Sequence, residues 1–276
     1  MSCYGKRVCA GCALDLPKAN FSTSQWNKKG VGLGARCRDC VVNGRDPGHM
    51  AIAVRRSFSS TQAVLDKGNP FASGTFRLVA KGLFTDGDRQ GQMMVAKWFK
   101  RGLSKEAAFF NADIEVNIRA RNLLAAFATI GVCSRPIRLN DTEIWYKPPR
   151  ATYRERGRWR TGPSYLQHAA HDEGKRVLVE AFIPGWEKFN SNSGWVSKNS
   201  SSRTTLNILG ALSHFSYHYS SGHYLLCDLQ GCSDGSGIIL SDCVINSTAA
   251  GRFGPSDLGP DGISTFFRCG RSLFEP

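Results

Sequence analysis

No apolar run in this sequence is long enough to cross a lipid bilayer. The longest, LLAAFATIGV from Leu123 to Val132, is far shorter than the roughly 20 residues that a membrane-spanning helix needs. The N-terminus, MSCYGKRVCAGC, also lacks the apolar segment of a secretory signal peptide. We therefore expect a soluble intracellular protein, cytoplasmic or nuclear, that has no membrane partner.

Acidic residues are scarce as well. The 276 residues include 22 Asp and Glu against 36 Lys and Arg, which gives a formal net charge of +14. A basic excess of this size favours an anionic partner, such as a nucleotide, a nucleic acid or an acidic protein, without choosing among them. The sequence contains no internal repeat, and its length fits one or two domains.

Four of the ten cysteines are concentrated near the N-terminus. They form two Cys-x2-Cys pairs, Cys9 with Cys12 and Cys37 with Cys40. Two such pairs can present four thiolates to one tetrahedral zinc ion, and in an intracellular chain metal binding explains clustered cysteines better than disulfides do. About forty residues with few large apolar side chains bury little core, so a metal would have to hold them together. The alternative is four unrelated thiols.

Residues 1–45 are therefore predicted to form a zinc-binding module of the zinc-ribbon or treble-clef type. Its many Lys and Arg residues could contact a nucleic acid or an acidic protein surface, and both alternatives stay open. Residues 46–67 are predicted to be a polar linker.

Apolar patterns beyond this linker predict an α+β domain. Strands are expected within 71–84, 91–100 and 176–185, and helices at 104–131 (with Gly131 as its C-cap), 206–219 and 263–269. The basic segment 150–162 is expected to be a solvated surface loop. This order of elements indicates two lobes with a cleft between them.

The segment LLCDLQGCSDGSGIILSDC, residues 225–243, carries two aspartates at the ends of short apolar runs. Asp228 follows the first run and Asp242 the second, and the glycine-rich bend between them predicts a hairpin. Gln230 lies two residues beyond the first aspartate. One interpretation is turn chemistry, because Asp is a common strand-end residue. The other is a metal-and-phosphate site, since Mg²⁺ prefers oxygen ligands.

Lys97 lies inside the apolar strand MVAKWF. It could be an edge-strand lysine whose ammonium reaches solvent, or it could neutralise nucleotide phosphate in a cleft. Glu180 follows the apolar run VLV and could pair with it. Just upstream, FASGTFR could be a phosphate-binding loop with Arg77 as a charge partner, although a small-residue turn needs no ligand.

Further candidate positions are ambiguous by themselves. Lys188 lies just after a turn in KFNSNSGW, and Gly254 and Gly259 bracket the loop GPSDLG. His214 lies on an amphipathic helix, where a histidine is more often a core residue than a metal ligand.

In their order along the chain, these motifs resemble the alpha-kinase family of atypical protein kinases, from about residue 68 to residue 276. The resemblance rests on VEAFIPG, KFNSNSGW, ALSHFSY and CDLQG. It implies two lobes around ATP, with an N-lobe at about 68–180 and a C-lobe at about 181–276. As in that family, the HRD and DFG signatures of conventional protein kinases are absent from the sequence.

The resemblance also implies roles for the residues above. Asp228 would be the catalytic aspartate that orients the substrate hydroxyl, and Gln230 and Asp242 would hold Mg²⁺. Lys97 would contact ATP and act in catalysis, with Glu180 as its partner on the ATP side. The other ATP-binding positions that the resemblance implies are Arg77, Lys188, Gly254 and Gly259.

The sequence departs from the family pattern at two places. The family builds a structural zinc site from a histidine in the position of His214 and a later H-x-C-x3-C run, where this chain reads RCGRSLFEP. We therefore predict that the usual form of this site is not built, and that the last helix docks by burying Ile263, Phe266 and Phe267. In addition, Asp257 replaces the usual Asn of the glycine loop, and its charge could weaken ATP or peptide binding.

The sequence thus predicts an alpha-type serine/threonine protein kinase that uses ATP and Mg²⁺ and carries a zinc-binding module. Its partners would be ATP and proteins with an acceptor serine or threonine. The alternative is a catalytically weak or inactive scaffold whose zinc module binds nucleic acid or a protein. The intact set Lys97, Asp228, Gln230 and Asp242 favours the enzyme.

Overall fold

The chain divides into two units, Met1–Ser57 and Phe58–Pro276. The computed structural model describes residues 6–9, 15–27, 35–38, 41, 58–66, 69–100, 106–147, 152–155, 158–161, 165–168, 175–198 and 202–270. The predicted linker at 46–67 is wrong in its second half, because the second unit begins at Phe58 and its first strand lies at Gln62–Leu65. The run QAVL is short, and only its pairing partners identify it as a strand.

The first unit has a small apolar core. Strands β1 (Lys6–Val8) and β2 (Asp15–Pro17) pair antiparallel and are followed by a 3₁₀ turn, η1 (Lys18–Asn20), and the short helix α1 (Thr23–Trp26). Among the residues described in this unit, Cys9, Phe21, Ala35 and Cys37 are buried, with Leu16 and Trp26 packed against them. The backbone N–H of Cys37 donates to Cys9 Sγ at 3.1 Å. The described members of the two Cys-x2-Cys pairs therefore meet, whereas Cys12 and Cys40 lie outside the described residues.

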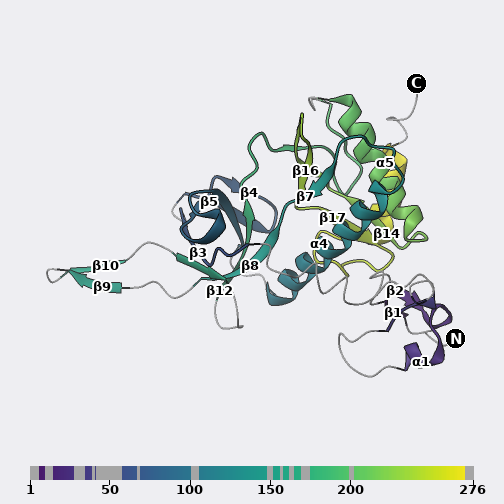
Figure 1. Cartoon of the computed structure of the whole chain (residues 1–276), viewed down its shortest axis with the longest axis horizontal. Coiled ribbons are helices and arrows are strands. Elements are labelled where there is room, and N and C mark those ends of the chain that lie inside the picture. Colours follow the sequence, from purple (N-terminus) through teal and green to yellow (C-terminus); the bar gives the residue numbers. More distant parts are fainter. Residues whose placement is uncertain are drawn as a thin grey trace. The chain divides into compact units, whose positions relative to one another are not determined.

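The second unit begins with an antiparallel barrel (Figure 1). In ring order its strands are β3 (Gln62–Leu65), β11 (Tyr165–His168), β8 (Thr142–Lys147), β12 (Lys175–Ala181), β6 (Met93–Phe99) and β5 (Arg77–Phe84). Strand β3 also pairs with β5, which closes the ring, and β4 (Ala72–Ser73) pairs with the start of β5. The turn between β5 and β6 contains η3 (Gly87–Arg89). Closing a sheet in this way removes the two free edges of an open one.

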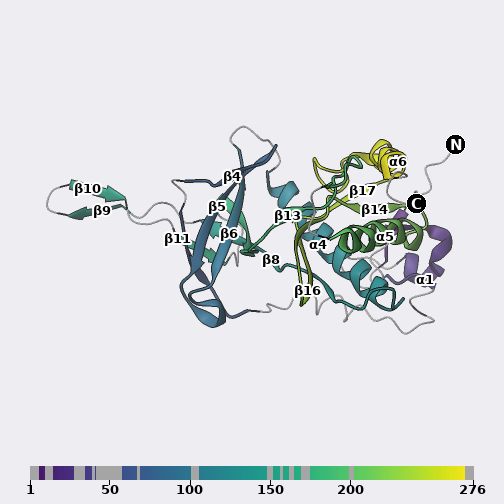
Figure 2. The same cartoon turned by 90° about the horizontal axis from the view of Figure 1, so that it is seen from above.

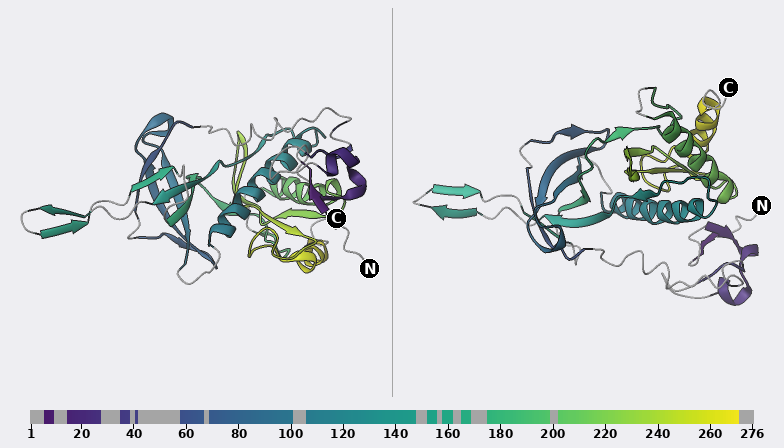
Figure 3. Two further views of the ribbon diagram at one scale, coloured as in Figure 1. Left: turned by 90° about the horizontal axis from the view of Figure 1, so that it is seen from below. Right: turned by 45° about the horizontal axis from the view of Figure 1, so that its top comes forward.

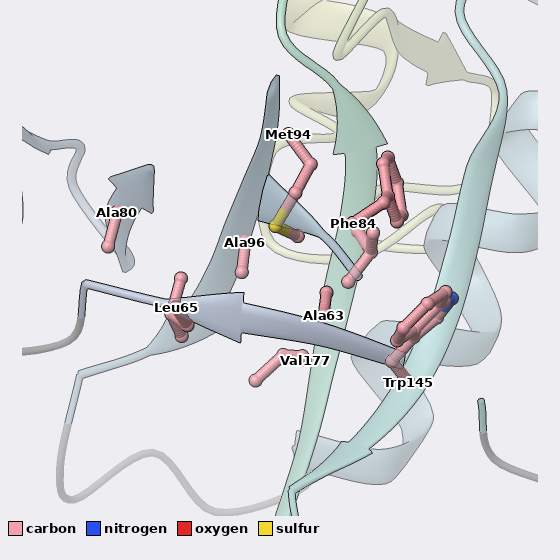
Figure 4. Packing of buried hydrophobic residues seen from close by; sticks show 9 residues of the cluster. Ala63, Leu65, Ala80, Phe84, Met94, Ala96, Trp145 and Val177 are labelled. Atoms are coloured by element: carbon pink, nitrogen blue, oxygen red, sulfur yellow. The ribbon is translucent and has the colours of Figure 1, made fainter. Parts of the chain in front are cut away.

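Inward-facing side chains fill the barrel. Phe84, Met94 and Trp145 are fully buried there together with smaller residues such as Ala80 and Ala96 (Figure 4). Phe84 and Trp145 lie with their ring centroids 5.7 Å apart. Burying each large apolar side chain stabilises the fold by about 2 kcal/mol. The barrel is thus a packed support for the residues on its outer face.

Helix α4 (Glu106–Ala128) covers part of that outer face. Phe110 on the helix packs against Phe99 at the end of β6, with ring centroids 5.1 Å apart. Gly131, at φ +73°, follows the last turn of the helix as predicted. No helix among the described residues is both long enough and apolar enough to span a membrane.

The C-terminal part contains two small sheets and two helices (Figure 2). One sheet has the order β13 (Glu187–Lys188), β15 (Gln230–Asp234), β16 (Gly237–Ser241) and β7 (Ile137–Leu139), and β7 runs parallel to β16. The other sheet pairs β14 (Tyr224–Cys227) with β17 (Val244–Ser247). Helix α5 (Arg203–Tyr219) packs on β14 and α6 (Gly259–Gly270) on β17 (Figure 3).

The last helix is held by apolar contacts, as predicted. Ile263 and Phe266 are buried, and Phe267 packs against the same cluster, which includes Leu225 and Cys227. His214 on α5 lies edge-on to the Phe267 ring, with centroids 4.9 Å apart.

Two local predictions were wrong. The basic segment 150–162 contains a hairpin, β9 (Thr152–Glu155) paired with β10 (Arg158–Thr161), where we expected a loop. The hairpin expected over residues 225–243 is formed only by β15 and β16, because the run before Asp228 pairs with β17 instead. Apolar runs identify strands but do not determine their partners.

Candidate active site

Lys97 lies on the outer face of β6, where its ammonium group is buried between two carboxylates. Its Nζ atom is 2.9 Å from Glu180 Oε2 and also forms an ion pair with Asp242. Only 7% of the lysine side chain is exposed. Burial lowers the pKa of Lys97, but the carboxylates of Asp242 and Glu180 outweigh burial and raise it above the ordinary value. The lysine is therefore a fixed cation, and the interpretation as a solvent-reaching edge lysine is wrong.

Glu180, on β12, is fully paired. Its Oε2 accepts from Lys97 and from the Ser241 hydroxyl at 2.6 Å, and its Oε1 accepts from the Thr142 hydroxyl at 2.9 Å. Asn117 on α4 in turn donates to Thr142 Oγ1 at 2.9 Å. Buried charges are tolerated when such partners surround them. The Glu180 carboxylate thus joins the barrel, α4 and the β15–β16 hairpin around Lys97.

Asp228 and Asp242 lie where the chain crosses between the two small sheets. Asp228 joins β14 to β15, and Asp242 joins β16 to β17. Both have left-handed backbone conformations, with φ of +54° and +55°, which non-glycine residues seldom adopt and which are often retained at functional sites. The tertiary structure thus places the two aspartates in equivalent positions, each in a segment that links one small sheet to the other.

The Asp228 carboxylate is paired with Lys188, whose Nζ lies 2.6 Å from Oδ1. Burial raises the pKa of Asp228, and the nearby Asp242 adds to this, while Lys188 and the backbone N–H of Asn192 oppose it. The net pKa is above the ordinary value for an aspartate. Asn190 fixes the adjacent residue, since its Oδ1 accepts from the N–H of Leu229 at 2.7 Å.

Gln230 lies in a cross-strand row with two other polar residues. It pairs with Lys188 on β13 and with Ser241 on β16, so the three side chains share one face of the sheet. Gln230 Nε2 donates to the backbone carbonyl of Asp242 at 3.1 Å. The next residue must be glycine, because a Cβ atom on Gly231 would lie 1.9 Å from a carbonyl oxygen of β16.

Arg77, at the start of β5, forms an ion pair with Asp113 of α4. Its guanidinium carbon also lies 4.4 Å from the centroid of the Phe99 ring. Burial raises the pKa of Asp113 to about 6, although Arg77 lowers it. Lys97 and Asp242 are near enough to affect the same carboxyl, so Arg77 belongs to the same group of charges.

The loop with Gly254 and Gly259 is held by Asp257. This buried carboxylate accepts from the N–H and the hydroxyl of Ser247 at 2.9 and 2.8 Å and from the N–H of Gly259 at 2.9 Å. The carboxylate is therefore held by hydrogen bonds from its own loop and from the end of β17, and the expected effect of its charge on ATP or peptide binding stays a prediction. Gly254 approaches α4 at Ala112, the residue before Asp113.

The structure thus links Lys97 with Glu180 and Asp242, Asp242 with Gln230, and Lys188 with Asp228, and it pairs Arg77 with Asp113, whose pKa the charges of Lys97 and Asp242 affect. The sequence reasoning missed Asp113, Thr142 and Ser241, and treated the asparagines of KFNSNSGW as ordinary turn residues. Ser241 could have been suspected from its place beside Asp242. Nothing in the local sequence around Thr142 or Asp113 indicates their partners.

A buried lysine and glutamate on the barrel thus meet carboxylates and an amide of the C-terminal part of the same unit. The alpha-kinase family profile matches residues 72–271. The chain belongs to the alpha-kinase family.

Curated relatives agree with this assignment. The chain is 30% identical over 205 residues to Alpha-protein kinase vwkA of Dictyostelium discoideum, covering 72% of this chain and 28% of the relative. It is 34% identical over 94 residues to the Eukaryotic elongation factor 2 kinase of Caenorhabditis elegans, covering 34% of this chain and 11% of that protein. The chain therefore spans less than a third of the length of these relatives.

Solved structures have the same fold. An alpha kinase from Entamoeba histolytica superposes with a TM-score of 0.58 at 19% identity, covering 83% of this chain and 87% of that one. The inactive alpha-kinase domain of myosin-II heavy chain kinase A, complexed with ATP, gives a TM-score of 0.57 at 15% identity, covering 80% and 98%. At these identities the likeness is one of fold alone.

Within the described part of the chain, no group of three or more His, Cys, Asp or Glu side chains is arranged to hold a metal ion. For His214, burial lowers the pKa and the nearby His218 lowers it further. Its ring is half-buried and lies against Phe267.

Proposed function

We propose that this protein is a serine/threonine protein kinase that transfers the γ-phosphoryl group of ATP to protein hydroxyls. The observation that carries the proposal is Lys97, buried between Glu180 and Asp242, with Asp228 close to the same Asp242 carboxylate. The relatives above are named protein kinases, and a protein of the same fold was solved with ATP. In the reaction, the acceptor oxygen bonds to the γ-phosphorus, the bond to the β–γ bridging oxygen breaks, and ADP leaves.

The residues would act mainly by positioning and charge neutralisation. Lys97 and Arg77 would face the phosphates, because both are cations on the same outer face of the β5–β6 ladder. Asp228 would orient the acceptor hydroxyl and take its proton. Lys188 supports this role, since it holds the Asp228 carboxylate in place and favours its ionised form.

The oxygen donors near Asp242 suit Mg²⁺. The Asp242 side chain keeps 33% of its surface exposed, and Gln230 donates its Nε2 hydrogen to the Asp242 carbonyl, which leaves Oε1 available as an acceptor. One carboxylate and one amide oxygen are a usual protein share of a magnesium site. When bound, the ion would neutralise charge on the phosphates. The family's Mg²⁺ would therefore be held by Gln230 and Asp242.

An apolar surface beyond Lys97 would take the nucleotide base. Val79 lies directly opposite Lys97 in the ladder, and further along the same face the opposed pair Lys81 and Val95 is followed by the opposed pair Leu83 and Met93. Leu83 and Met93 are 39% and 44% exposed. A planar base would cover such a surface and gain from burying it.

The test is transfer of labelled phosphate from Mg·ATP to a generic basic protein, comparing wild type with Asp228→Ala. We expect the variant to lose at least about 100-fold in rate, the usual scale for removing a general base, while it still binds ATP. Equal inactivity of both proteins would contradict the proposal and favour the scaffold alternative.

We also propose that the first unit binds one zinc ion through Cys9, Cys12, Cys37 and Cys40. The approach of the Cys37 amide to Cys9 Sγ supports this, as does the small core of four buried residues in the described part of the unit. Its basic residues would suit a nucleic acid or an acidic protein. Metal analysis should give about one zinc per chain, and Cys9→Ser with Cys37→Ser should remove it. No zinc in the wild type would refute the site, and two would indicate that the C-terminal site exists.

A further inference from the structure

Ser241 forms a hydrogen bond between the β15–β16 hairpin and the barrel. Its side chain is 4% exposed, and its hydroxyl donates to Glu180 Oε2 at 2.6 Å. The same carboxylate oxygen accepts from Lys97 at 2.9 Å. Ser241 is the last residue of β16 and directly precedes Asp242. One hydroxyl thus touches the partner of the lysine and adjoins the residue proposed to hold Mg²⁺.

The end of the hairpin has two side-chain links to this part of the barrel. One is the ion pair between Lys97 and Asp242, and the other is the hydrogen bond between Ser241 and Glu180. The ion pair must open if Lys97 is to face phosphate and Asp242 is to face a metal, as the proposed function requires. The Ser241–Glu180 bond has no such competitor in the proposed reaction, because there neither group is assigned a contact with phosphate or with the metal.

The backbone near Asp242 is also held by hydrogen bonds that do not involve the Ser241 side chain. The contribution of Ser241 is what these bonds do not provide. Asn140 donates its N–H to the carbonyl of Leu240 at 2.7 Å and its Nδ2 hydrogen to the carbonyl of Ala181 at 2.9 Å. These bonds fix the strand one residue before Ser241. They do not reach the carboxylate of Glu180 or the left-handed turn at Asp242.

From this arrangement we propose that Ser241 is a positioning residue for the kinase reaction. It keeps the Glu180 carboxylate aimed at Lys97 and holds the Asp242 turn against the barrel once the Lys97–Asp242 pair has opened. The inference rests on the proposed function. It predicts an effect on turnover and on the response to Mg²⁺ that is larger than the effect on nucleotide affinity.

The experiment compares wild type with Ser241→Ala, Ser241→Thr and Ser236→Ala in the full chain. Ser236 lies in the exposed turn of the same hairpin, where its hydroxyl bonds only to Asp234 among described residues, so it controls for loss of a hydroxyl. The measured quantities are kcat, KM for ATP, and the affinity of a fluorescent ATP analogue with and without Mg²⁺.

For Ser241→Ala we expect kcat to fall about tenfold, as a hydrogen bond to a charged group is worth at least about 1.5 kcal/mol. Analogue affinity without Mg²⁺ should stay within about threefold, while the gain in affinity on adding Mg²⁺ should shrink. Ser241→Thr keeps the hydroxyl and should restore most of kcat, and Ser236→Ala should match wild type.

An active wild type with an equally active Ser241→Ala variant would overturn the positioning role and leave the kinase function standing. A Ser241→Thr variant as impaired as Ser241→Ala would overturn it too, since the hydroxyl would then not be the relevant group. Absence of transfer by wild type would instead refute the function. If Ser241→Ala does not fold, Ser241→Cys is used in its place, because a thiol has a similar shape and is a weaker hydrogen-bond donor. The kcat of this variant must then lie between the wild-type value and zero.

Discussion

Two lysine–carboxylate pairs lie in the same site and differ in burial. Lys97 keeps 7% of its side chain exposed between Glu180 and Asp242, whereas Lys188 keeps 39% exposed beside Asp228. Breaking a buried pair leaves an uncompensated charge and is costly, while an exposed pair contributes little to stability. The first pair therefore supports the fold as well as the chemistry, and the second mainly controls one carboxylate.

The two pairs are also positioned by different means. Lys97 and Glu180 lie on neighbouring strands of a closed barrel, whose register fixes both backbones. Asp228 and Asp242 lie on left-handed turns that hydrogen bonds from Asn190 and Gln230 support. The barrel half of the site is thus fixed by secondary structure, and the other half by specific side-chain contacts.

Removing the buried cation should have the largest effect. Lys97→Met leaves Glu180 buried beside a neutral side chain, so we expect a loss of about 3–5 kcal/mol in the free energy of unfolding. Phosphoryl transfer should fall at least about 100-fold, because a phosphate-facing charge is lost. Urea unfolding and the transfer assay measure the two effects. Lys198→Met, at an exposed position, is the control. Equal stability of the Lys97→Met and Lys198→Met proteins would contradict the inference that the buried pair supports the fold.

Removing one neutral donor to Glu180 should cost less. Thr142→Val takes away the hydrogen bond to Oε1 and leaves Asn117 without its Thr142 acceptor, so we expect a loss of about 1–3 kcal/mol in the free energy of unfolding. Thr142→Ser retains the hydroxyl and should recover most of that stability. Equal stability of the Val variant and wild type would mean that the Glu180 network does not support the fold.

Removing the exposed cation should change the pH dependence more than the stability. Lys188→Met should alter the free energy of unfolding by no more than about 1 kcal/mol. Because Lys188 opposes the burial that raises the pKa of Asp228, that pKa should rise further in the variant. Activity is lost as pH falls through this pKa, so the acidic limb of the kcat/KM profile should move to higher pH. A limb that stays in place or moves to lower pH would show that Asp228 does not control it.

The smallest effect concerns Asp113, whose pKa is raised from 3.8 to about 6 mainly by burial. Between these values the folded protein binds more protons than the unfolded chain, so this group lowers stability as pH rises from about 4 to about 6. Above about 6 its effect is constant. The melting temperature of wild type minus that of Asp113→Asn should therefore fall as pH rises from about 4 to about 6 and then level off. A difference that grows with pH would contradict the raised pKa.

Sequence reasoning predicted the barrel half of the site better than the other half. The pairing of Lys97 with Glu180 is confirmed, because both lie within apolar strands that pair directly with each other in the barrel. The pairing of β14 with β17 was missed, since the run before Asp228 is buried on both sides and gives no alternation from which a partner could be inferred. Strand β3 was missed because it is only four residues long within a polar segment.

The candidate roles of Asp228, Gln230 and Asp242 remain predictions, although the structure gives the residues that contact them. Asp257 shows the limit of residue type alone: a carboxylate in a glycine-rich loop looks like a charge for a ligand, but it accepts hydrogen bonds from Ser247 on β17 and from the backbone of Phe253 and Gly259. Whether a polar group faces a ligand or its own backbone depends on which N–H groups the fold leaves unpaired.

The sequence by itself determined the three long helices, the strands that carry Lys97 and Glu180, the family and the pair formed by these two residues. These depend on short-range periodicity and on motifs that are read locally. Only the tertiary structure decided that Thr142 and Ser241 meet on the Glu180 carboxylate, and that Arg77 meets Asp113. Such contacts join segments far apart in the chain, and they follow from strand register and helix packing, which no local pattern of residues records.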